Sequence, residues 1–221
     1  MKTYADVFNG ELGKFEGEAH LEVDHSVPTV RLPLRKVPLA LQPPLEEELK
    51  HLEACGVIVC EERPTDWLSS LVVVPKTNGK IRLCSDPKPL NKALKRSHHP
   101  SLMLDELWPK LARAKVFSVC DVKNGYWHVQ LDEESSLLTT FATPTGRYRW
   151  RRLPFGVATA PELFQAKMDR AMAGLKGVST IVDDMIIWGE GETMDEAENN
   201  HDKNLRAMLE RCREKGLKLN P

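Results

Sequence analysis

The stretch that decides the fold is Val178-Ser-Thr-Ile-Val-Asp-Asp-Met-Ile-Ile-Trp188. Its apolar runs 178–182 and 185–188 flank the Asp183-Asp184 pair, which predicts two short strands joined by a tight turn. A separate apolar run, 116–120, ends directly at Asp121. Because apolar strands fix the backbone, carboxylates at their ends are held at defined positions. If these strands are neighbours, three carboxylates converge.

Three carboxylates at close range require a counter-cation, because like charges that close cannot all ionise comfortably. Hard oxygen ligands suit Mg²⁺ or Mn²⁺ rather than zinc. Two such ions about 3.5–4 Å apart are a standard device for in-line phosphoryl transfer. Asp is also favoured in turns. The residues alone therefore leave a metal site and an ordinary turn in balance.

Helices and hairpins are predicted on both sides of these strands. Together they indicate an α+β fold in which an antiparallel sheet is covered on one face by helices. Residues 1–36 show no sustained period and are expected to wrap or extend. The predicted elements are a helix from Pro43 to Gly56, a strand 56–60, hairpins at 70–84 and 139–153, a weak helix 102–111 interrupted by Pro109, a strand 126–131, a helix from Pro161 to Gly174, and a helix around Leu205–Cys212 that ends near Gly216.

Composition indicates a soluble globular chain. Of its 221 residues, 41% are hydrophobic and 29% charged, enough for one large domain or two subdomains that share a core. No window reaches the roughly 18 apolar residues that a membrane span needs, and the N-terminus does not resemble a signal peptide. The five cysteines are scattered without a Cys-x-x-Cys pair, which favours free thiols over disulfides or a zinc site.

Charge is segregated although the net charge is only −1. Basic residues cluster at 76–96 and at 147–152, whereas acids gather at 46–48, 132–134 and 190–198. Basic stripes on a near-neutral protein are compatible with a phosphate-lined partner held on one face. They are equally compatible with ordinary solvated surface.

Six motifs follow one another along the chain, and none is decisive alone. They are Val72-Val73-Val74-Pro75-Lys76, Leu90-Asn91-Lys92, Phe117-Ser118-Val119-Cys120-Asp121, Leu153-Pro154-Phe155-Gly156, Ala160-Pro161-Glu162-Leu163-Phe164-Gln165 and Ile181-Val182-Asp183-Asp184. In this order and spacing they resemble the reverse transcriptases of gypsy-class LTR retrotransposons, which are relatives of the retroviral enzymes. The resemblance runs from about Val37 to the end of the chain.

The resemblance implies a role for each matching residue. Asp121, Asp183 and Asp184 match the catalytic aspartates. Asp121 and Asp183 would hold two Mg²⁺ (or Mn²⁺) ions with Asp184 in support, and the Val122 carbonyl would complete the site of the nucleotide-bound ion. The other implied nucleotide-binding residues are Lys76 (or Lys80) and Arg82 at the triphosphate, Gly125 and Tyr126 at the deoxyribose, and Phe155 beside the pocket. Each has a plain alternative as a solvated charge, a core aromatic or a turn former.

The implied fold is a right-hand polymerase with fingers and palm, an antiparallel palm sheet backed by helices, and no thumb before Pro221. Residues 1–36 would form an N-terminal extension or linker. The fingers would comprise 37–97 and 129–154, and the palm 98–128 and 155–221. We expect the 147–152 cluster to contact template or the fingers surface rather than substrate phosphate. RNase H and integrase parts of a parent polyprotein are expected to be absent from this sequence.

The implied activity is RNA-directed DNA polymerisation, in which a primer 3′-hydroxyl attacks the α-phosphorus of a dNTP. The expected partners are a primed RNA or DNA template, dNTP and other parts of the polyprotein, without a membrane. The expected location is a cytoplasmic element particle, with the nucleus as an alternative. An inactive nucleic-acid-binding remnant of a retroelement is the alternative function. An unrelated Mg²⁺ phosphotransferase is disfavoured because no Gly-x-x-x-x-Gly-Lys-Ser/Thr loop occurs.

Overall fold

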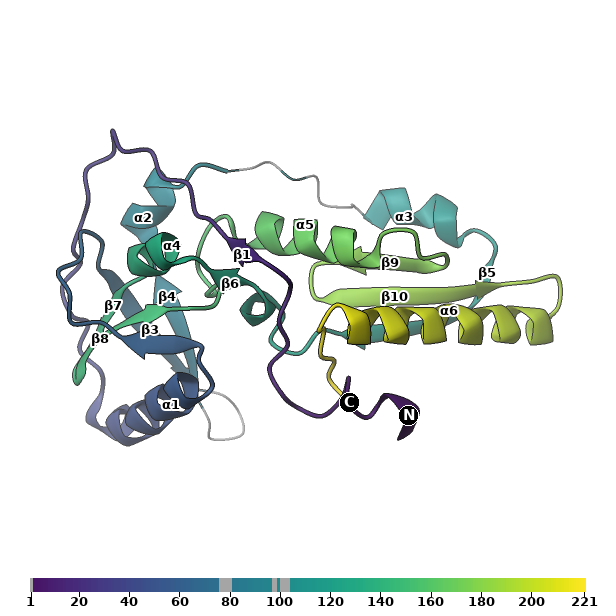
Figure 1. Ribbon diagram of the computed structural model, residues 1–221, viewed down its shortest axis with the longest axis horizontal. Helices are drawn as coiled ribbons and strands as arrows, with labels where there is room; N and C mark the ends of the chain where they lie inside the picture. Colours follow the sequence, from purple (N-terminus) through teal and green to yellow (C-terminus); the bar gives the residue numbers. More distant parts are fainter. Residues whose placement is uncertain (1, 76–80, 97–98, 100–103) are drawn as a thin grey trace. The chain divides into compact units, whose positions relative to one another are not determined.

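The structure is a computed structural model that describes residues 2–75, 81–96, 99 and 104–221 (Figure 1). Contacts divide the chain into two units. The first contains Met1–Glu16, His98–His128 and Pro161–Pro221, and the second contains Gly17–Ser97 and Val129–Ala160. The N-terminal segment 1–36 is thus shared between the units, and each unit has a sheet of its own.

The first unit is organised by a three-stranded antiparallel sheet in the order β5-β10-β9. The predicted hairpin at 178–188 is confirmed as β9 and β10, and the predicted strand before Asp121 is confirmed as β5. The elements of this unit are the 3₁₀ helix η1 (Lys2–Tyr4), α3 (Leu104–Leu111), β5 (Ala114–Asp121), the 3₁₀ helix η3 (Gly125–His128), α5 (Ala160–Met172), β9 (Val178–Ile181), β10 (Asp184–Glu190) and α6 (Met194–Glu214).

Helices α5 and α6 cover the same face of this sheet, as expected. The His201 Nε2 of α6 lies 2.9 Å from the Ser118 hydroxyl of β5, and the amide of Gln165 in α5 lies 3.1 Å from the Thr180 hydroxyl of β9. Strand register and alternation put Ser118 and Thr180 on one face. Figure 1 shows α6 running along β10. The carboxylates of Asp121 and Asp184 therefore belong to the opposite face.

Helix α6 begins eleven residues earlier than its apolar period predicts, at Met194 rather than near Leu205. A capping box starts it: the Thr193 hydroxyl accepts from the Glu196 amide, and the Glu196 carboxylate accepts from the Thr193 amide. The first half of the buried face carries His201 and Asn204 in place of large apolar residues. An apolar period cannot detect a face of that kind.

The strand predicted over 126–131 is wrong. The chain forms η3 up to His128 and only then the two-residue strand β6 (Gln130–Leu131). His128 is fully buried, and its Nε2 accepts a 3.1 Å hydrogen bond from the Lys218 amide. The adjacent Val129 is also fully buried. Consecutive buried residues are incompatible with the one-sided burial that the alternation suggested.

The second unit contains a five-stranded sheet in the order β2-β8-β7-β3-β4, in which only the β3–β7 pairing is parallel. Both predicted hairpins are confirmed, as β3–β4 and β7–β8, although the tip 76–80 lies outside the described residues. The elements are β1 (Glu18–Ala19), η2 (Leu39–Leu41), α1 (Gln42–Ala54), β2 (Ile58–Cys60), β3 (Ser69–Pro75), β4 (Ile81–Asp86), α2 (Lys88–Ala93), β6, α4 (Glu133–Leu138), β7 (Phe141–Thr143) and β8 (Gly146–Trp150).

An ion-pair network with a buried centre joins β8 to the loop after β2. The Arg149 side chain is 12% exposed, and its Nε donates to a Glu61 carboxylate oxygen at 2.8 Å. Arg63 and Glu133 extend the network. The charge of Arg149 is thereby paired with carboxylates of the protein itself.

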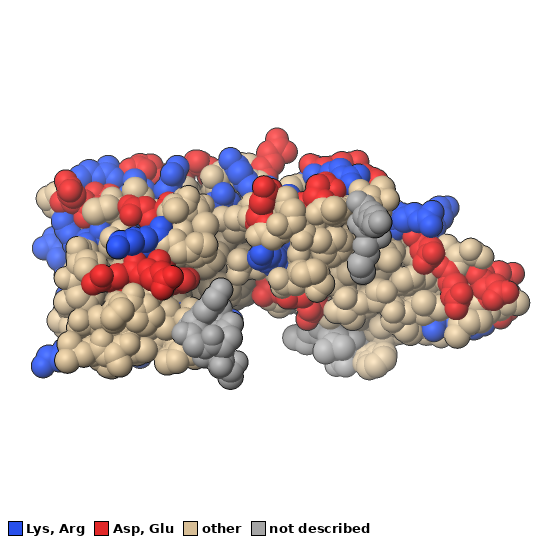
Figure 2. Space-filling view, turned by 90° about the horizontal axis from the view of Figure 1, so that it is seen from below, with Lys and Arg blue, Asp and Glu red and all other residues tan. Residues whose placement is uncertain are grey.

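The acids that cluster at 190–198 in the sequence lie on the surface of the first unit. Exposed carboxylates at Glu192, Asp195, Glu196 and Glu198 surround the start of α6, and Figure 2 shows Asp and Glu side chains gathered over that end of the helix. Negative charge at a helix N-terminus is stabilised by the helix dipole. Among the described helices, none combines the length and apolar character that crossing a bilayer requires.

Candidate active site

Strand pairing gathers the three predicted carboxylates at one end of the first unit's sheet. Asp184 lies directly opposite Asp121 in the β5–β10 ladder. Ile181 pairs with Asp184, so the turn between β9 and β10 consists of Val182 and Asp183 alone. Directly opposed residues of an antiparallel pair have Cβ atoms about 4.5–5.5 Å apart. The register thus brings the two acidic sequence motifs together.

Asp183 is the electrostatically strained member of the group. It is half-buried, and its Oδ1 atom is buried without a hydrogen-bond partner among the described residues. Burial first, and then the charges of Asp121 and Asp184, raise the pKa of Asp183 from 3.8 to about 6. A carboxylate that lacks both a donor and a counter-charge is suited to bind a cation.

Asp121 is held by a residue that the sequence did not indicate. The Asn220 Nδ2 donates to the Asp121 Oδ2 at 2.6 Å, and the Asn220 amide donates to the Asp121 carbonyl at 3.0 Å. One carboxylate oxygen is therefore fixed and the other stays available. Asn220 lies 99 positions away, in a segment without a periodic pattern, so only the folded backbone reveals it.

The turn that carries Asp183 is tied to the segment that follows Asp121. The buried Val122 donates its amide hydrogen to the Asp183 carbonyl at 2.9 Å. Val182 has a φ of +53°, a left-handed conformation that is unfavourable for a β-branched residue. Such strain costs about 1–3 kcal/mol and persists only where the surroundings enforce it.

Gly125 and Tyr126 line the same site. A Cβ atom at Gly125 would overlap the Asp183 Oδ1 atom and press on the Phe164 ring, so any larger residue would displace the Asp183 carboxylate. The ring of Tyr126 packs edge-on against Phe164 with centroids 5.5 Å apart. Burial, followed by the charges of Asp183 and Glu162, raises the pKa of the Tyr126 hydroxyl. Tyr126 thus stays protonated beside the carboxylates.

The donor set fits a divalent cation in its chemistry. Carboxylate oxygens are hard ligands of the kind that Mg²⁺ and Mn²⁺ prefer, and the orphaned Asp183 Oδ1 lacks a positive partner. Among the described residues, no group of three His, Cys, Asp or Glu side chains is already gathered at metal-binding distance. Binding would therefore require the carboxylates to adjust around the ion.

Comparison with known proteins identifies the family to which the chain belongs. The family model described as "Reverse transcriptase (RNA-dependent DNA polymerase)" matches residues 74–221, which include all three aspartates and both their strands. The chain belongs to the reverse transcriptase family. The resemblance seen in the motifs is thus confirmed for the reverse transcriptase family. Reverse transcriptases are nucleotidyltransferases.

The reverse transcriptase domain has relatives that are much longer. It is 35% identical to an uncharacterized protein of Caenorhabditis elegans, covering 98% of this chain and 17% of the relative. It is also 35% identical to the retrovirus-related Pol polyprotein from transposon 412 of Drosophila melanogaster, covering 74% of this chain and 13% of the polyprotein. The structure of the prototype foamy virus protease–reverse transcriptase matches 99% of this chain and 29% of its own, with a TM-score of 0.85 at 20% identity. That likeness shows a shared mixed α+β fold.

Nine site residues were predicted for this reverse transcriptase domain, and they fall into three groups. Six belong to the first unit: Asp121, Val122, Gly125, Tyr126, Asp183 and Asp184. Arg82 and Phe155 belong to the second, where the Arg82 guanidinium lies 5.8 Å from the centre of the Phe155 ring. Lys76 lies outside the described residues.

The turn that carries Phe155 is braced by a residue whose role the sequence did not reveal. The Asn91 Nδ2 donates to the Gly156 carbonyl at 2.8 Å, and the Ala158 amide donates to the Asn91 Oδ1 at 2.8 Å. Gly156 has a φ of +102° and approaches the Ser85 carbonyl closely. Asn91 and Gly156 thus fix the position of Phe155 within the second unit.

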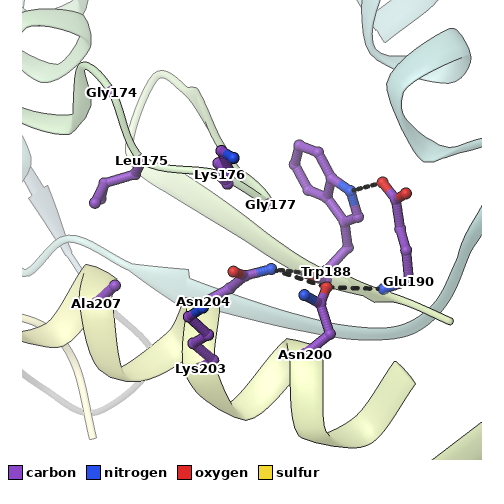
Figure 3. Close-up of a pocket in the computed structure, with 10 residues that line it drawn as sticks. All are labelled: Gly174, Leu175, Lys176, Gly177, Trp188, Glu190, Asn200, Lys203, Asn204 and Ala207. Atoms are coloured by element: carbon purple, nitrogen blue, oxygen red, sulfur yellow. Dashed lines mark hydrogen bonds between the residues drawn. The ribbon is translucent and has the colours of Figure 1, made fainter. Parts of the chain in front are cut away.

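One cavity of this reverse transcriptase domain lies away from the aspartates. It has a volume of about 550 Å³ and lies at the far end of β10 from Asp184 (Figure 3). In Figure 3 the Asn204 side chain points to the Trp188 carbonyl, to which its Nδ2 donates at 2.8 Å. The lining residues are Gly174, Leu175, Lys176, Gly177, Trp188, Glu190, Asn200, Lys203, Asn204 and Ala207.

Proposed function

We propose that this domain performs RNA-directed DNA polymerisation in a gypsy-class retroelement, adding deoxynucleotides to a primer 3′-hydroxyl. One observation carries the proposal: the strand register gathers Asp121, Asp183 and Asp184, and burial together with the charges of Asp121 and Asp184 raises the pKa of Asp183 to about 6. A site of this kind is poised for divalent cations and phosphate chemistry.

Asp121 and Asp183 would hold two Mg²⁺ or Mn²⁺ ions, with the Val122 carbonyl as a further ligand and Asp184 in support. When bound, such ions acidify a primer hydroxyl and neutralise charge on the phosphates. The chain's own residues have three tasks. Asn220 keeps one Asp121 oxygen oriented, Gly125 leaves space beside the Asp183 carboxylate, and the protonated Tyr126 presents a rigid ring at the deoxyribose position.

Lys76, Arg82 and Phe155 are proposed as nucleotide ligands on the family motifs alone. Arg82 is exposed, and its guanidinium lies over the Phe155 ring. A guanidinium suits triphosphate oxygens because it can donate two parallel hydrogen bonds. The fingers (37–97 and 129–154) and the palm (98–128 and 155–221) remain a proposal, as does the extension 1–36.

The proposed partners are a primed template and dNTP. The foamy viral protease–reverse transcriptase, which shares the fold, has been solved in complex with an RNA/DNA hybrid, with a TM-score of 0.83 at 22% identity. Template choice would rest on base pairing, so the protein would need mainly backbone contacts and shape. The activity belongs to the longer polyprotein of which this domain would be a part, with cytoplasmic particles or the nucleus as its location.

Primer extension on poly(rA)·oligo(dT) tests the proposal. We expect Mg²⁺- or Mn²⁺-dependent extension by the parent protein, and a loss of about 10²–10³-fold in Asp183→Asn, because metal stabilisation of transition-state charge is worth several kcal/mol. Glu198→Gln, which removes one exposed carboxylate from α6, is the matched control and should retain activity.

The contrary outcome is equally specific. If neither the parent nor Asp183→Asn extends primers while both bind primer–template equally, the polymerase proposal fails. The domain would then be a non-catalytic nucleic-acid-binding remnant.

A further inference from the structure

The Val182-Asp183 turn is unusual for a two-residue hairpin. Such turns need a positive φ at their first residue, where glycine is preferred, yet this chain has Val182 there with a φ of +53°. A β-branched residue does not adopt this conformation unaided. Some contact must therefore hold the turn. The direction of the turn sets where the Asp183 carboxylate points.

That contact is made by Gln165 of α5. Gln165 is 2% exposed, and its Oε1 accepts a 2.9 Å hydrogen bond from the Val182 amide. This is the backbone N–H of the strained residue itself, one position before Asp183. A buried side chain on a helix thus holds the Val182 end of the turn, whereas the Val122 amide holds the Asp183 carbonyl.

Asp169, one helical turn further along α5, decides which way the Gln165 amide faces. A carboxylate only accepts hydrogen bonds, and the Asp169 Oδ1 accepts from the Gln165 Nε2 at 2.7 Å and from the Thr180 hydroxyl at 2.9 Å. Its other oxygen lies 2.8 Å from the His99 Nε2. With the Nε2 of Gln165 committed to Asp169, only its Oε1 is left to face the Val182 amide.

We propose that Gln165, oriented by Asp169, is a positioning residue that holds the Val182 turn and thereby aims the Asp183 carboxylate at its cation. The inference rests on the proposed function for its catalytic consequence, but not for its geometry. Partners that orient a metal ligand are worth about 10- to 100-fold in metal affinity or activity. Gln165 acts through Val182 and itself touches neither cation nor substrate.

Gln165→Met keeps the length of the side chain and removes its hydrogen bonds. The matched control is Asn204→Leu, because Asn204 is another buried amide that braces β10, at the end away from Asp183. Both variants delete a buried amide of the same unit, so both should lower the free energy of unfolding in urea. Only Gln165→Met should also lower Mn²⁺ affinity, by about 10- to 100-fold in an EPR titration.

A rescue experiment separates positioning from packing. Gln165→Glu keeps an acceptor for Val182 but sets a second carboxylate against Asp169, so Mn²⁺ affinity should fall. Adding Asp169→Asn exchanges the amide and the carboxylate between the two positions. The Thr180 hydroxyl can then reverse its role, because a hydroxyl both donates and accepts. The double variant should regain Mn²⁺ affinity to within roughly threefold of the parent, since position 169 again donates to or accepts from position 165 and holds the acceptor for Val182 in place.

Hydrogen exchange of the Val182 amide gives a readout that needs neither metal nor catalysis. Gln165→Met should speed this exchange about 10-fold through the lost hydrogen bond, whereas Asn204→Leu should leave it unchanged. The proposal is overturned if Val182 exchange is unaltered, if Gln165→Met weakens Mn²⁺ binding no more than Asn204→Leu, or if the double variant is no better than Gln165→Glu. A parent protein that fails to extend primers would refute the polymerase proposal, while Val182 exchange would still decide the role of Gln165.

Discussion

Asp183→Asn should stabilise the metal-free protein at neutral pH although it removes a proposed catalytic group. The pKa of Asp183 is raised from 3.8 to about 6 by burial and by the charges of Asp121 and Asp184. In the folded protein the carboxyl thus keeps its proton over a range in which the unfolded chain has lost it. The contribution of Asp183 to the free energy of unfolding therefore falls as pH rises from about 4 to 6. Above pH 6 the ionised carboxylate continues to destabilise the folded protein.

The size of the effect follows from the shift. About two pKa units correspond to at most about 3 kcal/mol at 1.36 kcal/mol per unit. Asp183 is only half-buried, so solvent screening reduces this figure to about 1–2 kcal/mol. The amide of Asp183→Asn does not ionise. The variant should exceed the parent by about that amount at pH 8 and by almost nothing at pH 4.

Urea unfolding followed by tryptophan fluorescence at pH 4 and pH 8, with EDTA present, measures this difference. Glu198→Gln on the exposed side of α6 controls for the change in net charge and should show no such pH dependence. Saturating Mn²⁺ should reverse the order at pH 8, because the parent binds it more tightly. Equal stability of the two proteins at pH 8, or a gain that does not change with pH, would refute the reasoning.

Three other perturbations have defined outcomes. Gly125→Ala should weaken Mn²⁺ binding in an EPR titration and cost about 1–3 kcal/mol in urea unfolding, because the new Cβ overlaps the Asp183 Oδ1; unchanged binding would contradict the close packing of Asp183 against Gly125. Asn220→Ala should lower Mn²⁺ affinity by about 10-fold, since it frees the Asp121 Oδ2; an unaffected titration would remove Asn220 from the site. Glu61→Ala should cost about 3 kcal/mol at pH 7, because it strips a buried partner from Arg149. Arg63 holds the pKa of Glu61 at about 2, so the stability from Glu61 is present above pH 4.5 and is lost as pH falls toward 2; a destabilisation equally large at pH 2 and 7 would count against the ion pair.

The strands and hairpins were predictable because local patterns specify them. The apolar residues on both sides of Asp183-Asp184 and the apolar run before Asp121 predict strands and a turn from local sequence alone. The register of these strands is given by the structure. The strand expected over 126–131 failed for a long-range reason. His128 is buried and accepts a hydrogen bond from the amide of Lys218, 90 positions away. No local pattern contains that information.

The carboxylates of the site could be predicted, but their supports could not. Asp121 and Asp183 follow apolar strands and so are visible in the sequence. Asn220 and Gln165 hold atoms of distant segments, the Asp121 carboxylate and the Val182 amide. Asn220 stands in no pattern, and the motif that contains Gln165 does not reveal which atom its amide holds. The strain at Val182 is likewise invisible, because nothing in its residue type indicates a positive φ.

Single-nucleotide incorporation on an RNA template with a DNA primer tests the central claim most directly. With Mg²⁺, the parent protein should add the complementary deoxynucleotide in preference to the other three, and EDTA should abolish the reaction. Asp183→Asn should be slower by about 10²-fold or more while it remains folded and at least as stable as the parent at pH 8. Incorporation by Asp183→Asn at the parent's rate would contradict the assignment of Asp121, Asp183 and Asp184 as the polymerase centre.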